Sequence, residues 1–221
     1  MYEYKGVKIS WLGHDGFRIK GEKTIYVDPF KITATNLEPA DYLLISHEHM
    51  DHCSPEDAKK VCGPGTVILT IKSCEEKLKG QVNAKEIRIV SPGQSLKLNG
   101  VELTMVPAYN TNKFREPGIP FHPKADGKVG FIVKMGGVSI YHTGDSDFTE
   151  EMGAVKNIDV ALIPVSGTYV MTAEEAAQAA DRLAPKVAIP MHYGTIVGSD
   201  DDARKFKALV KGCSVEILSK E

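Results

Sequence analysis

The 221-residue sequence predicts an α/β fold in which β-sheets are covered by helices. Apolar runs of strand length alternate with segments that carry helix-start signals, which is the pattern of buried strands flanked by helices. The pattern occurs twice, because each half begins with predicted β-hairpins and continues with strand–helix units. No linker or low-complexity tract separates the halves, so we expect residues 1–221 to form a single domain.

The first half opens with three short strands punctuated by glycine, before any helix. These strands are expected at residues 7–12, 16–20 and 24–28. An apolar strand at 42–45 leads into a polar loop, after which Ser54 and Pro55 have the residue types of a helix N-cap and first helical position. A strand at 66–71 follows, and Ser73 offers a capping box for a second helix.

The second half begins with two hairpins, which turn at Asn99-Gly100 and at Gly136-Gly137. Their strands are expected at 96–98, 101–106, 129–134 and 138–142. Strands at 160–163 and 187–191 then alternate with a helix from Thr172 to Leu183 and a helix from Ser199 to near Gly212. A final strand is expected at 214–218.

Composition indicates an ordinary globular protein, with 42% hydrophobic residues, 25% charged residues and a formal net charge of −2. Because no bulk positive field is present, we expect neither nucleic acid nor an anionic membrane as partner. The start of the chain lacks a secretory signal and no apolar run has the length of a membrane span, which predicts a cytoplasmic protein. A small-molecule substrate is expected, and assembly into a homo-oligomer stays open.

The segment Ser46–Ser54 places three histidines and one aspartate within six residues, directly after the strand at 42–45. In an extended chain, side chains on the same face lie about 6.6 Å apart, whereas nitrogens around one tetrahedral zinc lie ~3.4 Å apart, so this segment must curl into a loop. A curled loop lets His47 and His49 converge on one cation while Asp51 and His52 face a second. The alternative, in which the histidines line a strand end and Asp51 caps a helix, is disfavoured by four such groups in one loop.

The motif His-x-His-x-Asp-His resembles the signature of the metallo-β-lactamase superfamily. Further similarities are Gly13-His14, Asp28-Pro29, Gly144-Asp145 and Pro190-Met191-His192-Tyr193. Together they are closest to the small single-domain group that includes the ascorbate-6-phosphate lactonase and other metal-dependent hydrolases. The resemblance implies a four-layer αββα sandwich of two mixed β-sheets flanked by helices, with a one- or two-metal hydrolytic site at the edge of the sheets.

The resemblance also implies roles for residues outside the motif. Asp145 would bridge the two metals, His192 would complete the second, and Asp28 would support the metal loop from behind. The family usually has a further histidine for the first metal after the strand that ends at Val106, but this sequence reads Pro107-Ala108-Tyr109-Asn110 there. We expect His122 to replace it; the alternatives are an Asn110 oxygen, a water molecule or a site with one metal.

The expected chemistry is hydrolysis of a lactone, ester or phosphodiester by a hydroxide held between one or two divalent ions. Zinc is the first expectation, with manganese and iron as alternatives, because imidazole and carboxylate ligands accept all three. Asp51 would orient the hydroxide and hold the second metal. His14 or His142 could donate hydrogen bonds behind the ligands or protonate the leaving group.

The polar, proline-rich stretch 107–128 is expected to form a lid or wall of the site, the alternative being a mobile surface loop. Asn110, Lys113 and Lys124 within it are candidates for binding a small anionic substrate. The alternative is that these lysines are solvated surface, since acidic residues are interspersed. Two rival functions also stay open: a small endonuclease of the same fold, and a non-catalytic metal-binding or sensing protein.

Overall fold

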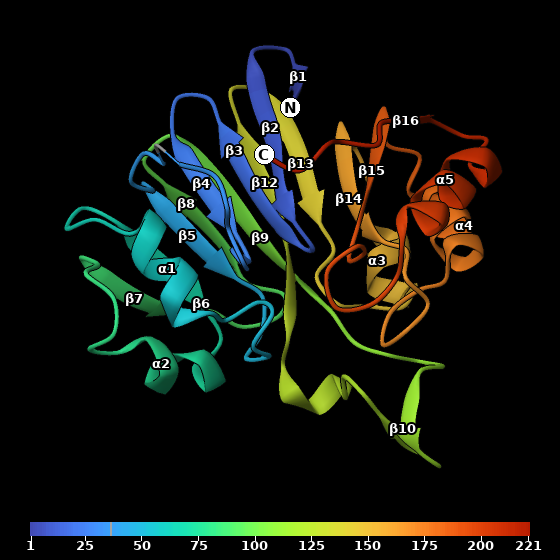
Figure 1. Cartoon of the computed structure of the whole chain (residues 1–221), viewed down its shortest axis with the longest axis horizontal. Coiled ribbons are helices and arrows are strands. Elements are labelled where there is room, and N and C mark those ends of the chain that lie inside the picture. The colour runs from blue at the N-terminus through green and yellow to red at the C-terminus, as the bar shows by residue number, and fades with distance from the viewer. Residues whose placement is uncertain (36) are drawn as a thin grey trace.

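The computed structural model, which describes residues 1–35 and 37–221, has two seven-stranded mixed sheets that face each other and carry helices on their outer sides (Figure 1). The first sheet contains β1 (Tyr2–Tyr4), β2 (Val7–Gly13), β3 (Gly16–Lys20), β4 (Thr24–Val27), β5 (Tyr42–Ile45), β6 (Val67–Thr70) and β7 (Glu86–Ile89), in that order. The predicted four-layer αββα fold is confirmed.

The second sheet has the order β16-β15-β14-β13-β12-β9-β8. Its strands are β8 (Ser95–Leu98), β9 (Val101–Pro107), β12 (Val129–Met135), β13 (Val138–His142), β14 (Val160–Pro164), β15 (Val187–Met191) and β16 (Ser214–Val215). The helices are α1 (Pro55–Val61), α2 (Lys72–Leu78), α3 (Glu150–Ala154), α4 (Ala173–Leu183) and α5 (Asp200–Leu209).

Both sheets change from antiparallel to parallel pairing at their middle. Strands β1 to β4 pair antiparallel and β4 to β7 pair parallel, while β8, β9, β12 and β13 pair antiparallel and β13 to β16 pair parallel. Antiparallel neighbours are joined by short turns, whereas parallel neighbours need crossovers, which explains why the helices occur only in the later part of each half. The predicted repetition of hairpins followed by strand–helix units is therefore confirmed.

The core lies between the sheets and beneath the helices. Ile9, Leu43, Phe131 and Ile140 from the strands are at most 1% exposed. Helix α4 packs close to β14 because its buried face is made of small alanines, and Thr172 closes its N-terminus with a capping box to Glu175. This continuous apolar layer holds the strand ends, and therefore the loops that follow them, in fixed positions.

Two boundary predictions are wrong. Helix α2 begins at Lys72 with Ile71 as N-cap and no side-chain cap, because Ser73 lies inside the helix and its hydroxyl donates to Glu48 Oε2 at 3.1 Å. The final strand contains only Ser214–Val215, since the chain then leaves the sheet and the backbone N–H of Glu221 donates to the carbonyl of Trp11.

The stretch 107–128 is more regular than expected. It contains a small hairpin, β10 (Phe114–Glu116) with β11 (Ile119–Pro120), and a 3₁₀ turn η1 (Lys124–Asp126). Figure 1 shows this hairpin projecting from the body of the molecule. No helix among the described residues is long and apolar enough to cross a membrane.

Candidate metal centre

The metal loop follows β5, Asp145 follows β13 and His192 follows β15, so three buried strands of the two sheets deliver side chains to one edge. The turn between β2 and β3 adds His14 and Asp15 at the same edge. The carboxyl ends of parallel strands are the usual location of functional groups in such sheets, because the loops that follow them converge there. The predicted site residues therefore come together from both halves of the chain.

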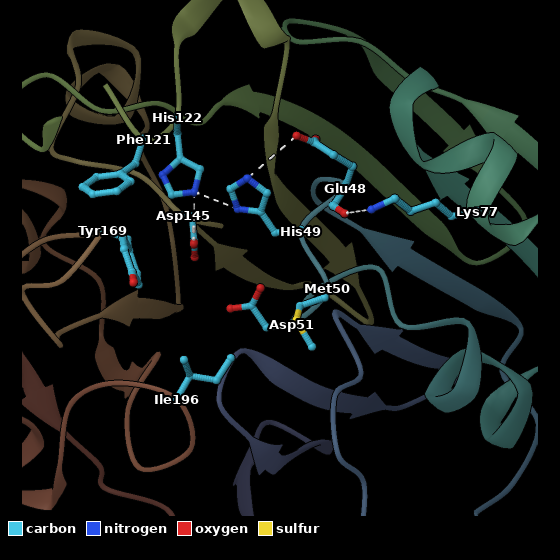
Figure 2. Close-up of a pocket in the computed structure, with 10 residues that line it drawn as sticks. All are labelled: Glu48, His49, Met50, Asp51, Lys77, Phe121, His122, Asp145, Tyr169 and Ile196. Carbon is cyan, nitrogen blue, oxygen red and sulfur yellow. Dashed lines mark hydrogen bonds and ion pairs between the residues drawn. The ribbon is translucent and has the colours of Figure 1, made fainter. Parts of the chain in front are cut away.

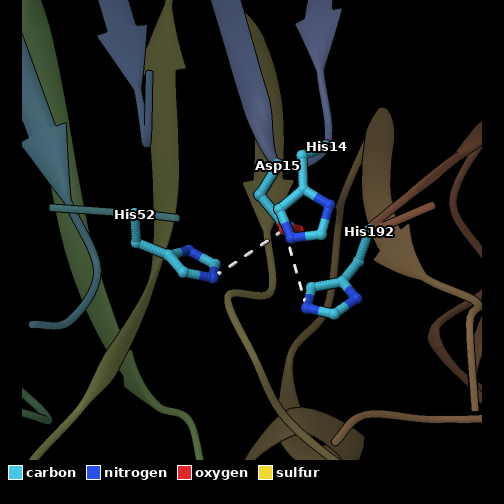
Figure 3. A group of neighbouring side chains, drawn as sticks. All are labelled: His14, Asp15, His52 and His192. Atoms are coloured by element: carbon cyan, nitrogen blue, oxygen red, sulfur yellow. Dashed lines mark ion pairs between the residues drawn. The ribbon is translucent and has the colours of Figure 1, made fainter. Parts of the chain in front are cut away.

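Two groups of side chains have ligand atoms that lie within 4.8 Å of one another, and each group could hold a metal ion. The first group consists of His47, His49, His122 and Asp145. The second group consists of His14, Asp15, His52 and His192, which Figure 3 shows converging from three separate segments.

In the first group, His122 Nε2 lies 3.3 Å from His49 Nδ1 and 3.4 Å from Asp145 Oδ2. These separations match the ~3.4 Å expected between nitrogens around one tetrahedral zinc. His122, which the sequence suggested as a replacement ligand, thus lies with the other two histidines. Asn110 lies behind it, where its Oδ1 accepts hydrogen bonds from the His122 ring Nδ1 at 2.8 Å and from the His122 backbone N–H at 2.9 Å.

In the second group, one oxygen of Asp15 lies 3.8 Å from His52 Nε2 and 4.0 Å from His192 Nε2. Asp15 was not predicted from the sequence, although an acidic residue between Gly-His and Gly at a strand turn was an available signal. Asp51 lies beside this group rather than inside it. Its Oδ2 is 3.0 Å from His14 Nε2 and 3.8 Å from His52 Nε2.

Asp145 contacts both groups. Its Oδ1 lies 3.4 Å from His52 Nε2, and its Oδ2 lies 3.3 Å from His192 Nε2, in the second group. The same Oδ2 lies 3.9 Å from His47 Nε2, in the first group. One carboxylate therefore joins two clusters of imidazole nitrogens.

Three histidines direct Nε2 into the centre because Nδ1 is held from outside. The partners of Nδ1 are Ser46 Oγ for His47 (3.0 Å), Asp28 Oδ2 for His52 (2.8 Å) and Ser166 Oγ for His192 (2.9 Å). Such outer hydrogen bonds fix the tautomer and the orientation of a ligating ring. Asp28 also accepts hydrogen bonds from the Ser46 backbone and hydroxyl, so it lies where the resemblance placed a supporting carboxylate.

Several buried polar atoms of the centre have no hydrogen-bond partner. Among the described residues, all but two of the buried side-chain atoms without a hydrogen bond belong to the two groups, the exceptions being Tyr141 Oη and Asp147 Oδ1. They include Nε2 of His47, His52 and His192 and both oxygens of Asp15. An unpaired buried polar atom costs about 1–3 kcal/mol. A divalent ion accepts such nitrogen and oxygen donors, so these residues fit a metal.

The charges of the centre favour a cation. Burial alone would raise the pKa of Asp145, but His192 and His52 overcome this and hold it well below its usual value. Burial would lower the pKa of His52 and His192, but the negative charge of Asp145 outweighs it. The pKa of His52 therefore lies well above its usual value, and that of His192 is about 9. Burial and the nearby His52 instead lower the pKa of His47 well below its usual value. The buried carboxylate of Asp145 thus attracts positive charge to the site.

Backbone strain occurs at three positions of the centre. His14, Asp28 and His192 have φ angles of 53°, 42° and 60°. This left-handed region is uncommon for residues other than glycine, and it persists where the surrounding structure imposes it, often at functional sites. Here it turns the chain at strand ends so that His14 and His192 face the centre and Asp28 supports His52 from behind.

Of three further predicted site residues, His142 lies behind the ligands and two lysines lie away from the centre. Gly144 N–H donates to His142 Nδ1 at 3.2 Å, and His142 Nε2 lies 2.9 Å from the Asp15 carbonyl, so the ring braces backbone and is unsuited to protonate a leaving group. Lys113 pairs with Glu175 at 2.7 Å and Lys124 pairs with Glu151 at 2.6 Å. The acidic neighbours draw both lysines away from the metal centre, so the structure does not support substrate binding by them.

A cavity of about 450 Å³ opens onto the first group (Figure 2). Its lining residues are Glu48, His49, Met50, Asp51, Lys77, Phe121, His122, Asp145, Tyr169 and Ile196. His122 and Phe121 come from the stretch 107–128, so this stretch forms a wall of the pocket, as expected. The cavity has the volume of a small-molecule site.

Known proteins resemble the chain over nearly its full length. The model of the β-lactamase superfamily domain matches residues 8–192. A curated relative from Archaeoglobus fulgidus, named UPF0173 metal-dependent hydrolase, is 32% identical in an alignment of 232 positions, gaps included, that covers 96% of this chain and 95% of the relative.

Solved structures agree with this similarity. A protein of Parabacteroides distasonis assigned as a metal-dependent hydrolase is 30% identical, with a TM-score of 0.82 over 96% of this chain and 94% of that one. A metallo hydrolase from the archaeon Ignicoccus hospitalis is 25% identical, with a TM-score of 0.77 over 97% and 95% of the two chains. The chain therefore belongs to the metallo-β-lactamase superfamily and is a metal-dependent hydrolase.

Proposed function

We propose that the protein hydrolyses a carboxylic ester or lactone of a small molecule at a centre of two divalent ions. The observation that carries the proposal is the Asp145 carboxylate, which lies 3.3–3.9 Å from imidazole nitrogens of both groups. A carboxylate in that position can serve two ions at once. Zinc is the first candidate, and manganese and iron use the same ligands.

The first ion would be held by His47, His49 and His122 together with Asp145. The second would be held by His52, His192 and Asp15, again with Asp145. The unpartnered Nε2 atoms and the unpartnered carboxylate of Asp15 support this division. When bound, the ions would supply a hydroxide at neutral pH and polarise the bond under attack.

Asp51 is the residue best placed to handle the attacking water. It lines the cavity, and its Oδ2 is held by His14 Nε2 at 3.0 Å. Burial would raise the pKa of Asp51, but the hydrogen bond from His14 and the nearby His52 lower it to about 2. Asp51 therefore stays ionised at neutral pH, so its carboxylate can accept a hydrogen bond from the attacking water and orient the oxygen toward the substrate. His14 is a positioning residue for this carboxylate.

The paired lysines favour an ester or lactone over the small anionic substrate predicted from sequence. Lys113 and Lys124 are paired with carboxylates outside the cavity, and Lys128 is buried against Glu48 at 2.6 Å. A phosphodiester, and nucleic acid above all, would need free cations beside the reacting group. Phosphodiesters are therefore included in the test as the substrate class whose exclusive turnover would contradict an ester or lactone substrate.

The test combines metal analysis with a panel of lactones, carboxylic esters and phosphodiesters. We expect two ions per chain and turnover of the esters or lactones. Asp51→Ala should lose turnover, and His192→Ala should lose turnover together with one ion. Metal bound without any turnover, or activity that survives both substitutions, would contradict the proposal; turnover confined to phosphodiesters would reassign the substrate.

A further inference from the structure

We infer that four apolar side chains around the cavity bind an uncharged hydrocarbon arm of the substrate, an inference that rests on the proposed ester or lactone hydrolysis. The four residues are Met50, Phe121, Tyr169 and Ile196, and we call them the apolar wall. Figure 2 shows Phe121, Tyr169 and Ile196 on the side of the cavity opposite Glu48 and Lys77.

The apolar wall is assembled from four separate loops. Met50 belongs to the metal loop and Phe121 to the stretch 107–128, while Tyr169 lies between β14 and α4 and Ile196 between β15 and α5. The same loops, or the strand ends before them, carry His49, His122 and His192. Folding therefore places an apolar side chain from each loop next to the ligand-bearing segments.

Three members of the apolar wall are open to solvent in the free protein. Met50 is 69% exposed, Ile196 is 45% exposed and Tyr169 is 36% exposed. Tyr169 meets Phe121 edge to face, with ring centroids 4.8 Å apart. Grouped apolar side chains at the mouth of a reactive centre gain free energy when a ligand covers them, which is typical of a binding surface.

Tyr169 is held in its position at an energetic cost. Its φ angle of 69° is unfavourable for an aromatic residue. Its carbonyl accepts a hydrogen bond from Asn110 Nδ2 at 2.9 Å, while the Oδ1 of the same amide holds the ring of His122. One asparagine thus fixes the apolar wall relative to a side chain of the first metal group, as a substrate-positioning contact requires.

The charges of the cavity indicate that the arm is uncharged. Glu48, Asp51 and Asp145 contribute carboxyl groups to the lining. Lys77 is the one lysine or arginine among the described lining residues, and its ammonium donates to the backbone carbonyl of Glu48 at 2.5 Å. An anionic arm along the apolar wall would have no lysine or arginine beside it in the described part of the lining, because Lys77 lies on the opposite side of the cavity (Figure 2), whereas a hydrocarbon arm would cover the apolar wall.

The binding test uses straight-chain carboxylates from acetate to octanoate, the acid products of the matching esters, with calorimetry of the metal-loaded protein. We expect affinity to rise by up to about fourfold for each methylene that becomes buried. Ile196→Glu should abolish the rise, and so should Tyr169→Gly, which removes the ring but suits the backbone angle. Ile217→Glu is the matched control, because Ile217 is 36% exposed and lies outside this cavity, and it should retain the rise.

The kinetic test uses esters of one alcohol with acetyl or octanoyl arms, and a third ester whose long arm ends in a carboxylate. We expect kcat/KM to be at least about tenfold higher for the octanoyl ester, a ratio that Ile196→Glu collapses and Ile217→Glu preserves. Equal responses in wild type and Ile196→Glu, or a preference for the carboxylate-ended arm, would overturn the inference but not the proposed function. If neither an ester nor a lactone is hydrolysed while carboxylate affinity still rises with chain length, the proposed function fails and the apolar wall stands.

Discussion

The two metal groups differ in their contact with solvent. His49 in the first group is 42% exposed, whereas His14, Asp15, His52 and His192 of the second group are each at most 1% exposed. The first group faces the cavity and the second lies beneath it. In the proposed two-ion centre, the buried group would hold its ion firmly and the open group would contact the substrate.

The two groups are also supported differently from behind. His122 in the first group relies on the amide of Asn110, a residue of a long loop. His52 in the second group relies on Asp28, a buried carboxylate that also binds the backbone and hydroxyl of Ser46. A charge-assisted hydrogen bond is stronger than a neutral one, so the buried group is held more rigidly.

The largest effect is expected from Asp145→Asn, which removes the carboxylate shared by both groups. Loss of an outer partner alone costs about 10–100-fold in metal affinity, so loss of this residue should reduce affinity for both ions by more than about 100-fold and abolish turnover. Metal content and kcat/KM measure the result. Asp147→Asn is the control, because no histidine of either group contacts Asp147; if Asp145→Asn retained both ions, the shared role would be refuted.

Removal of metal should occur in two phases. A chelator should strip the first ion quickly, with loss of activity, and the second slowly, with a fall in Tm, because only the first group is open to solvent. An ion present at a thousand times its Kd stabilises the fold by about 4 kcal/mol. Metal release and unfolding can be followed in parallel, and simultaneous loss of both ions would show that the groups are not distinct.

Substitution of Asp15 and Asp51 should separate metal binding from turnover. Asp15→Asn should release the second ion, since both oxygens of the buried carboxylate are otherwise unpartnered. Asp51→Asn should reduce kcat while most of the metal stays bound, because Asp51 lies at the open side, next to His14. The two variants are controls for each other. Identical metal contents in both would contradict the assignment of Asp15 to metal binding and Asp51 to turnover.

The outer partners should act on one group each. Asn110→Ala should weaken binding of the first ion by about 10–100-fold, and Ser166→Ala should have that effect on the second ion only. Competition with a metal-binding dye measures the two affinities. An equal effect of either variant on both ions would mean that the centre responds as one unit.

The smallest effect is expected from Lys113→Ala and Lys124→Ala. Both lysines are paired with glutamates outside the cavity, so kcat/KM should be unchanged for the ester and lactone panel. Steady-state kinetics measures this, with Lys205→Ala as a remote control. A marked rise in KM for an anionic substrate would restore the role predicted from sequence.

Much of the fold was predictable because local signals agreed with tertiary structure. Asn99-Gly100 formed the expected hairpin, and Ser54 and Thr172 cap their helices as predicted. Predictions failed where a distant contact decided the outcome. Ser73 has the residue type of a helix cap, yet its hydroxyl binds Glu48 from within the helix.

For the site, the density of histidines after β5 was sufficient to predict a metal loop, because few other arrangements require four potential ligands within six residues. The strand and helix signals of the sequence predicted sheets covered by helices, and its resemblance to the superfamily implied the αββα sandwich and placed His47, His49, His52, Asp145 and His192 in one centre.

Only the tertiary structure decided how these side chains divide into two groups, that His122 joins the first and that Asp15 joins the second. The tertiary structure also places Lys113 and Lys124 outside the site and brings the four residues of the apolar wall together. The physical reason is that ligand geometry and pocket polarity depend on which loops meet across the two sheets. The spacing of residues along one loop constrains the conformation of that loop, but it does not specify which ligand residue a loop after another strand contributes.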